Sequence, residues 1–93
     1  TMEHMEGIIH IQLKILKKML LKQEISIEVT PAAIDWIKRE GFDMQFGARP
    51  LKRLIQKRLV DMISMEILKD NIRPGMNVAI DANSDGLVFK SLQ

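Results

Sequence analysis

An arginine that precedes a proline is the residue best placed for chemistry. Arg49 and Pro50 lie in a stretch from Gly41 to Arg53 that begins with one glycine and has a second at Gly47. Pro50 suits the first position of a helix, because its missing N–H would have no intrahelical partner there. The two glycines permit positive φ, so we expect this stretch to double back tightly between two helices. A guanidinium beside free helix N–H groups suits an anion, above all a phosphate.

Other residues give little support for catalysis. The five glycines form no Gly-x-x-x-x-Gly-Lys-Ser/Thr pattern, so the chain has no loop that cradles nucleotide phosphates and is not a complete ATPase. His4 and His10 lack a metal-ligand partner at helical spacing, which favours exposed helix positions over a metal site. Acidic residues are scattered, and no serine lies in a nucleophile-elbow pattern. We therefore predict no catalytic residue and no metal site within the chain.

The composition indicates one small domain. Ninety-three residues with 46% hydrophobic content can build a single core, so residues 1–93 are predicted to form one domain. A net charge of +2 gives little electrostatic reason to propose a nucleic acid. The sequence has no cysteine, no run long enough to span a membrane and no targeting signal at its start, so we expect a cytoplasmic, soluble protein.

The first predicted element is a helix from about Met2 to Lys22, with Thr1 as its cap. Gln12 breaks its pattern by falling near the middle of the apolar face. The amide either is half-buried and bonds nearby backbone, or lines a ligand site. The apolar residues that share this broad face at 100° per residue are Met2, Met5, Ile8, Ile9, Ile11, Leu13, Ile15, Leu16, Met19 and Leu20.

The remaining elements follow from alternation and turn residues. Ile25 to Val29 alternates as a short strand, and Thr30-Pro31 then caps and opens a second helix that ends at Gly41. Trp36 is interpreted as a core anchor, with a ligand platform as the alternative. The other predicted elements are a helix from Pro50 to about Lys69, a strand from Met76 to Asp81, a loop from Asn83 to Gly86 and a strand from Leu87 to Lys90.

The third helix carries two features of its own. Its predicted buried stripe is Leu51, Leu54, Ile55, Leu59, Met62 and Met65, widened later by Ile63 and Ile67. Its second half should therefore be buried on more than one side. Arg53 and Lys57 should stand on the outward face in line with Arg49 as a basic ridge, either as solvated surface or as a contact site. The whole pattern predicts an α+β fold, with three helices packed on one side of a small three-stranded sheet.

Residues Gly47 to Arg53 resemble the sensor 2 motif of Clp-type AAA+ unfoldases, closest to the second ATPase module of ClpB-type chaperones. Ile11-Gln12-Leu13 and Asp85-Gly86-Leu87-Val88-Phe89 stand in the order and spacing of that module's C-terminal small domain, so the resemblance covers nearly the whole chain. The family commonly has tyrosine where Phe42 and Phe46 stand, and proline at Met44. Hydrogen bonds made by those tyrosines are therefore not expected here.

The resemblance implies a nucleotide-sensing lid of a hexameric ring that threads and disaggregates proteins. Arg49 would contact the γ-phosphate of ATP, bound with magnesium in a preceding large domain. The adenine base of this ATP would be bordered by Ala48, Ile9, Gln12 and Leu13. No nucleotide is expected to stay tightly bound to this domain alone.

The implied partners are the large domain of the same chain, neighbouring subunits and unfolded or aggregated proteins, with no nucleic acid and no membrane. Lys52, Arg53 and Lys57 are candidates for contacts with the next subunit, as is an exposed strand edge. The alternative from the residues alone is a free-standing basic module, in which Arg49, Lys52, Arg53 and Lys57 bind an acidic protein or a nucleic acid.

Overall fold

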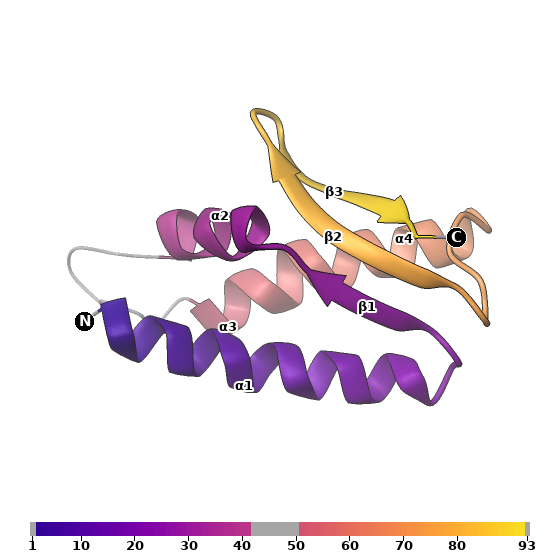
Figure 1. The fold of residues 1–93 in the computed structure, drawn as a ribbon, viewed down its shortest axis with the longest axis horizontal. Helices are drawn as coiled ribbons and strands as arrows, with labels where there is room; N and C mark the ends of the chain where they lie inside the picture. Colours follow the sequence, from indigo (N-terminus) through magenta and orange to yellow (C-terminus); the bar gives the residue numbers. More distant parts are fainter. Residues whose placement is uncertain (1, 42–50, 93) are drawn as a thin grey trace.

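The computed structural model describes residues 2–41 and 51–92, with side chains from residue 4 onward. The elements run in the order α1 (Met2–Leu21), β1 (Ser26–Val29), α2 (Pro31–Gly41), α3 (Leu51–Leu54), η1 (Ile55–Val60), α4 (Asp61–Leu68), β2 (Asn77–Asn83) and β3 (Gly86–Ser91). Segments α3, η1 and α4 follow one another without a break and form one long helix (Figure 1). The predicted α+β fold of three helices and a three-stranded sheet is thus confirmed for the described residues.

The sheet is mixed, with β2 in the centre. Strand β1 pairs parallel to β2, with Ile27 opposite Val78, and β3 pairs antiparallel, with Phe89 opposite Ile80. The β2–β3 connection is a tight hairpin in which Gly86 has a φ of +127°, as its predicted left-handed role requires. The sheet crosses above α1 and in front of the long helix (Figure 1).

One hydrophobic core joins all these elements. Removing such side chains from water contributes about 1.5–3 kcal/mol each. The largest fully buried members come from the helices, from the sheet and from the segments just before β1 and β2: Met5, Ile9, Ile25, Ile37, Leu51, Leu59, Ile63, Ile72, Val78 and Ile80.

The broad apolar face predicted for α1 divides into two parts. Met5, Ile9 and Leu13 belong to the buried core as predicted, together with Leu16 and Leu20. Ile11, Ile15 and Met19 are instead 60%, 50% and 55% exposed. The face is too wide for the long helix and the sheet to cover, so its outer edge remains on the surface.

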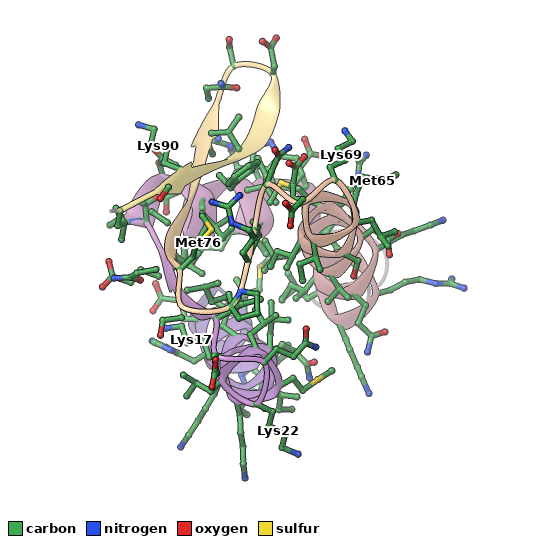
Figure 2. All side chains as sticks on the ribbon, turned by 90° about the vertical axis from the view of Figure 1, so that its right-hand side faces the viewer. Lys17, Lys22, Met65, Lys69, Met76 and Lys90 are labelled. Atoms are coloured by element: carbon green, nitrogen blue, oxygen red, sulfur yellow. The ribbon has the colours of Figure 1, made fainter. Side chains whose placement is uncertain are left out.

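The long helix differs from prediction in its middle and second half. Its η1 segment is π-helical, with wider i→i+5 turns. The buried row therefore advances in steps of four, through Leu51, Ile55, Leu59 and Ile63. Met65, predicted on the buried stripe, is 53% exposed and points away from the sheet (Figure 2). The prediction that the second half is buried on more than one side is wrong.

The start of α2 follows the prediction. Pro31 is its first residue, and the Thr30 hydroxyl oxygen accepts a hydrogen bond from the Ala33 N–H at 3.2 Å. This bond satisfies one of the N–H groups that a helix leaves free at its first turn. Trp36 is half-buried and packs against the core, which confirms its interpretation as a packing residue.

Gly41 was expected to allow a positive φ, and its role in the structure is different. It is the last residue of α2 but has no positive φ. A Cβ at this position would lie 2.3 Å from Cδ2 of Leu51, far inside van der Waals contact. A glycine is needed here because α3 approaches closely, and not because the backbone turns into the left-handed region.

Candidate functional site

Three helix ends meet at one end of the molecule. The beginning of α1, the end of α2 and the beginning of α3 lie together at the left of Figure 1. An ion pair between Lys38 and Glu6 joins α2 to α1, and the contact of Gly41 with Leu51 joins α2 to α3. This end is therefore fixed by packing and by charge.

The chain between Gly41 and Leu51 carries the predicted anion-binding arginine. Arg49 and Ala48 lie outside the described residues, as do Gly47 and Pro50. Both residues that border this segment are described, and both are buried. The structure thus fixes the two points from which the segment leaves and to which it returns.

Two of the predicted α1 residues line a small pocket between α1 and α2. Ile9 and Leu13 are only 2% and 4% exposed, and they form its wall together with Glu6, His10 and Ile34. The pocket has a volume of about 130 Å³. Pockets that hold whole small molecules measure roughly 300–1,000 Å³, so this one has room for part of a ligand.

A second hollow continues from this pocket along α1. It shares His10, Leu13 and Ile34 with the first and extends to Lys17 and to Val29 of β1. Its walls combine apolar side chains with the amino groups of Lys14 and Lys17. Among the described residues that line this extension, Lys14 and Lys17 are basic and none is acidic.

Gln12 lines a different hollow from Ile9 and Leu13. Its side chain is half-buried, in line with both interpretations of this amide, and it lines a groove between α1 and η1. The structure therefore brings Ile9 and Leu13 together in one pocket and places Gln12 outside it.

The basic residues of the long helix are on the surface. Lys52, Arg53 and Lys57 are all exposed, in agreement with the predicted outward face. Arg53 and Lys57 also border a shallow hollow that includes Glu40 at the end of α2. Their alignment with Arg49 stays a prediction, because that residue is not described.

One ion pair at this end joins α1 and α2 and changes the titration of Glu6. Lys38 bonds the Glu6 carboxylate and holds the pKa of Glu6 below its usual value. Since Glu6 and Lys38 are 32 positions apart, no local pattern predicts their contact. The roles of Glu6, His10 and Ile34 in the pocket were accordingly not predicted from the sequence.

Metal and membrane features are absent from the part of the chain that the structure describes. No cluster of three or more His, Cys, Asp or Glu side chains there could hold a metal ion. None of its helices combines the length and the apolar character needed to cross a membrane.

Comparison with known protein families identifies the family of this chain. The profile of the C-terminal, D2-small domain of ClpB protein matches residues 1–80. The chain belongs to the ClpB D2-small domain family. It is thus a domain of ClpB/ClpC AAA+ chaperones, and it corresponds to the small domain of ClpB-family AAA+ ATPases.

Individual relatives match over nearly the whole chain. The chaperone protein ClpB of Bacteroides thetaiotaomicron is 35% identical over 98% of the chain and 11% of its own length. The ClpB of Streptomyces albus G is 42% identical over 84% of the chain and 9% of its own length. The negative regulator of genetic competence ClpC/MecB of Bacillus subtilis is 38% identical over 96% of the chain and 11% of its own length. The chain therefore spans about a tenth of the length of these relatives.

Proposed function

We propose that this D2-small domain is the nucleotide-sensing lid of a hexameric, ATP-dependent protein disaggregase or unfoldase. Arg49 is the sensor: it contacts the γ-phosphate of ATP bound with Mg²⁺ in a preceding large domain. Hydrolysis then changes that contact and so changes the angle between the two domains. The ClpB D2-small match over residues 1–80, which includes Arg49, is the observation that carries this proposal.

The packing around the motif supports a sensor at this place. One residue, Pro50, separates Arg49 from Leu51, which is fully buried and in contact with Gly41. Because Arg49 is so close in sequence to the buried core, a change in its contact with phosphate would move the whole domain. Arginine suits the role because its planar fork donates two parallel hydrogen bonds to phosphate oxygens.

The size of the α1 pocket supports a shared nucleotide site. A volume of about 130 Å³ is too small for a whole nucleotide, and the apolar walls at Ile9 and Leu13 suit one edge of a base. The rest of such a site, including the phosphate-binding loop and the Mg²⁺ ligands, must come from another domain. In this proposal Ala48 and Gln12 extend the adenine wall beyond Ile9 and Leu13, with Gln12 reaching the base from the neighbouring groove.

The exposed cations Lys52, Arg53 and Lys57 are proposed to contact the neighbouring subunit of the ring. Exposed side chains on a rigid helix are available for such contacts without disturbing the core. Unfolded or aggregated polypeptides are the proposed substrates of the complete ring.

The test compares wild-type, Arg49→Ala, Arg49→Lys and Lys52→Ala full-length proteins. ATP affinity, ATP turnover and recovery of aggregated protein are measured for each, and Trp36 fluorescence checks the fold. Loss of a preorganised donor at a developing charge costs about a hundredfold or more in rate, so Arg49→Ala should cripple turnover. Arg49→Lys should rescue only in part, because an ammonium lacks the bidentate fork.

Lys52→Ala serves as the matched control, since it removes a nearby cation from the same helix. If Arg49→Ala equals wild type in all three measurements with its fold intact, the sensor assignment is wrong. The same conclusion holds if Lys52→Ala is the more damaging change.

A further inference from the structure

A stripe of large apolar side chains runs along the surface of α1. Ile11, Ile15 and Met19 are half exposed or more, and they are spaced four residues apart. Residues at this spacing lie on one face of a helix, so the three side chains form a continuous row, which we call the α1 stripe.

A groove lies beside the α1 stripe, between α1 and η1. It has a volume of about 270 Å³ and includes Ile15 and Met19 of the stripe itself. The other lining residues are Gln12, Leu16, Ile55, Gln56 and Val60. Of the seven residues that line it, five are apolar and none is acidic.

Lysines flank the α1 stripe on one side. Lys14, Lys18 and Lys22 each follow a stripe residue by three positions and are exposed. On a helix, residues three apart are neighbours, so each apolar side chain has an amino group beside it. Lys22, directly after the end of α1, extends away from the sheet (Figure 2).

We propose that the α1 stripe and its groove bind an amphipathic helix of another protein, with an apolar face and acidic residues along one edge. Two helical walls around an apolar floor are the usual receptor for such a helix, which inserts side chains at i, i+4 and i+7. The acidic edge meets the lysine row and sets the orientation. This interaction goes beyond nucleotide sensing and does not depend on it.

A second copy of the chain fits the surface less well. Two copies that meet through the α1 stripe bring two lysine rows together, and like charges in an interface disfavour association. Charge complementarity therefore selects a partner of opposite sign.

The test uses this chain and two synthetic amphipathic peptides with the same leucine face. One peptide carries glutamates along one edge and the other carries lysines there. Fluorescence anisotropy of the labelled peptides gives the Kd at low and high salt. The acidic peptide should bind about tenfold more tightly or better, and added salt should reduce the difference.

Variants locate the binding surface. Ile15→Ser should weaken binding of the acidic peptide about fivefold or more, since central apolar anchors carry most of the affinity. Leu68→Ser is the matched control, because Leu68 is 83% exposed but lies on α4, away from the α1 stripe. Lys18→Glu should weaken binding of the acidic peptide, whereas Lys69→Glu should not.

Several results overturn the proposal. Equal affinity for both peptides, or no binding of either, would show that the surface does not bind an acidic amphipathic helix. Equal losses in Ile15→Ser and Leu68→Ser place the binding elsewhere. A dimer in sedimentation that Ile15→Ser dissolves assigns the stripe to a second copy. Trp36 fluorescence confirms that each variant is folded before its binding is compared.

Discussion

The Thr30 hydroxyl donates a hydrogen bond to Oδ1 of Asp81 at 2.7 Å and thereby ties the start of α2 to the central strand β2. The same oxygen of Asp81 accepts the N–H of Ala82 at 2.9 Å, and Oδ2 lies 3.6 Å from the Lys90 ammonium on β3. One carboxylate thus links a helix cap to two strands. Because α2 runs from this cap to Gly41, the link also helps to position the end of α2.

Thr30→Ala should lower the free energy of unfolding by about 1–2 kcal/mol, because it removes the cap of α2 and the donor to Asp81 together. Urea unfolding followed through Trp36 measures the change. Thr30→Ser keeps the hydroxyl and is the matched control. A Thr30→Ser protein as unstable as Thr30→Ala would show that the methyl group, and not the hydrogen bonds, is what matters.

Acid should weaken the fold through Asp81. The hydrogen bond from Thr30, then that from the Ala82 N–H, and the Lys90 charge hold the pKa of Asp81 below its ordinary value of about 3.9. A carboxyl with a lowered folded pKa contributes stability above its unfolded pKa and loses it as the pH falls through the folded pKa. We therefore expect wild-type stability to decline below about pH 4 more steeply than that of Asp81→Asn.

Denaturant unfolding at a series of pH values makes this comparison. Glu6, whose pKa is lowered by Lys38, acts in the same direction in both proteins, so the difference between them isolates Asp81. Glu6→Gln is the parallel control. Identical pH profiles for wild type and Asp81→Asn would contradict the role given to this carboxylate.

Gly41→Ala should destabilise the domain by about 1–3 kcal/mol, as overpacking usually does. The new methyl group would lie 2.3 Å from Cδ2 of Leu51 and 3.3 Å from Cδ2 of Leu54. Leu51 is fully buried and cannot move aside freely. The midpoint of thermal unfolding measures the effect, and Gly7→Ala is the control, since nothing lies within 4 Å of a Cβ there. Equal stability of both variants would mean that α3 shifts without cost.

The sequence predicted those features that local chemistry determines. The Thr30-Pro31 cap, the hairpin at Gly86 and the presence of three strands follow from residue type and neighbours, and the structure confirms them. The predicted alternation does not hold in β2, where Ala79 is buried as well as Val78 and Ile80. Periodicity also located most of the core. It failed at Met65, since a 3.6-residue period does not anticipate a π-helical segment.

The candidate site was predicted less completely. Local spacing grouped Gln12 with Ile9 and Leu13, but the crossing of α1 by two different helices separates their surroundings. The Glu6–Lys38 ion pair joins residues far apart in the chain, so only the tertiary structure reveals it. The exposure of Ile15 likewise could not be predicted locally, because it depends on how much of α1 the other elements cover.

Gln12→Leu should reduce ATP affinity of the full-length protein about fivefold to tenfold and narrow its preference for ATP over GTP. Ile9 and Leu13 are almost fully buried and apolar, so they cannot distinguish one purine from another. The half-buried amide of Gln12 is the polar member of the proposed adenine wall, and a hydrogen bond from it is worth about 1 kcal/mol. Competition between labelled ATP and GTP gives both affinities.

Ile9→Val is the matched control for this experiment. It should lower the free energy of unfolding by about 0.5–1.5 kcal/mol through lost packing, while the ratio of ATP to GTP affinity stays constant. If Gln12→Leu leaves that ratio unchanged, the amide does not face the base.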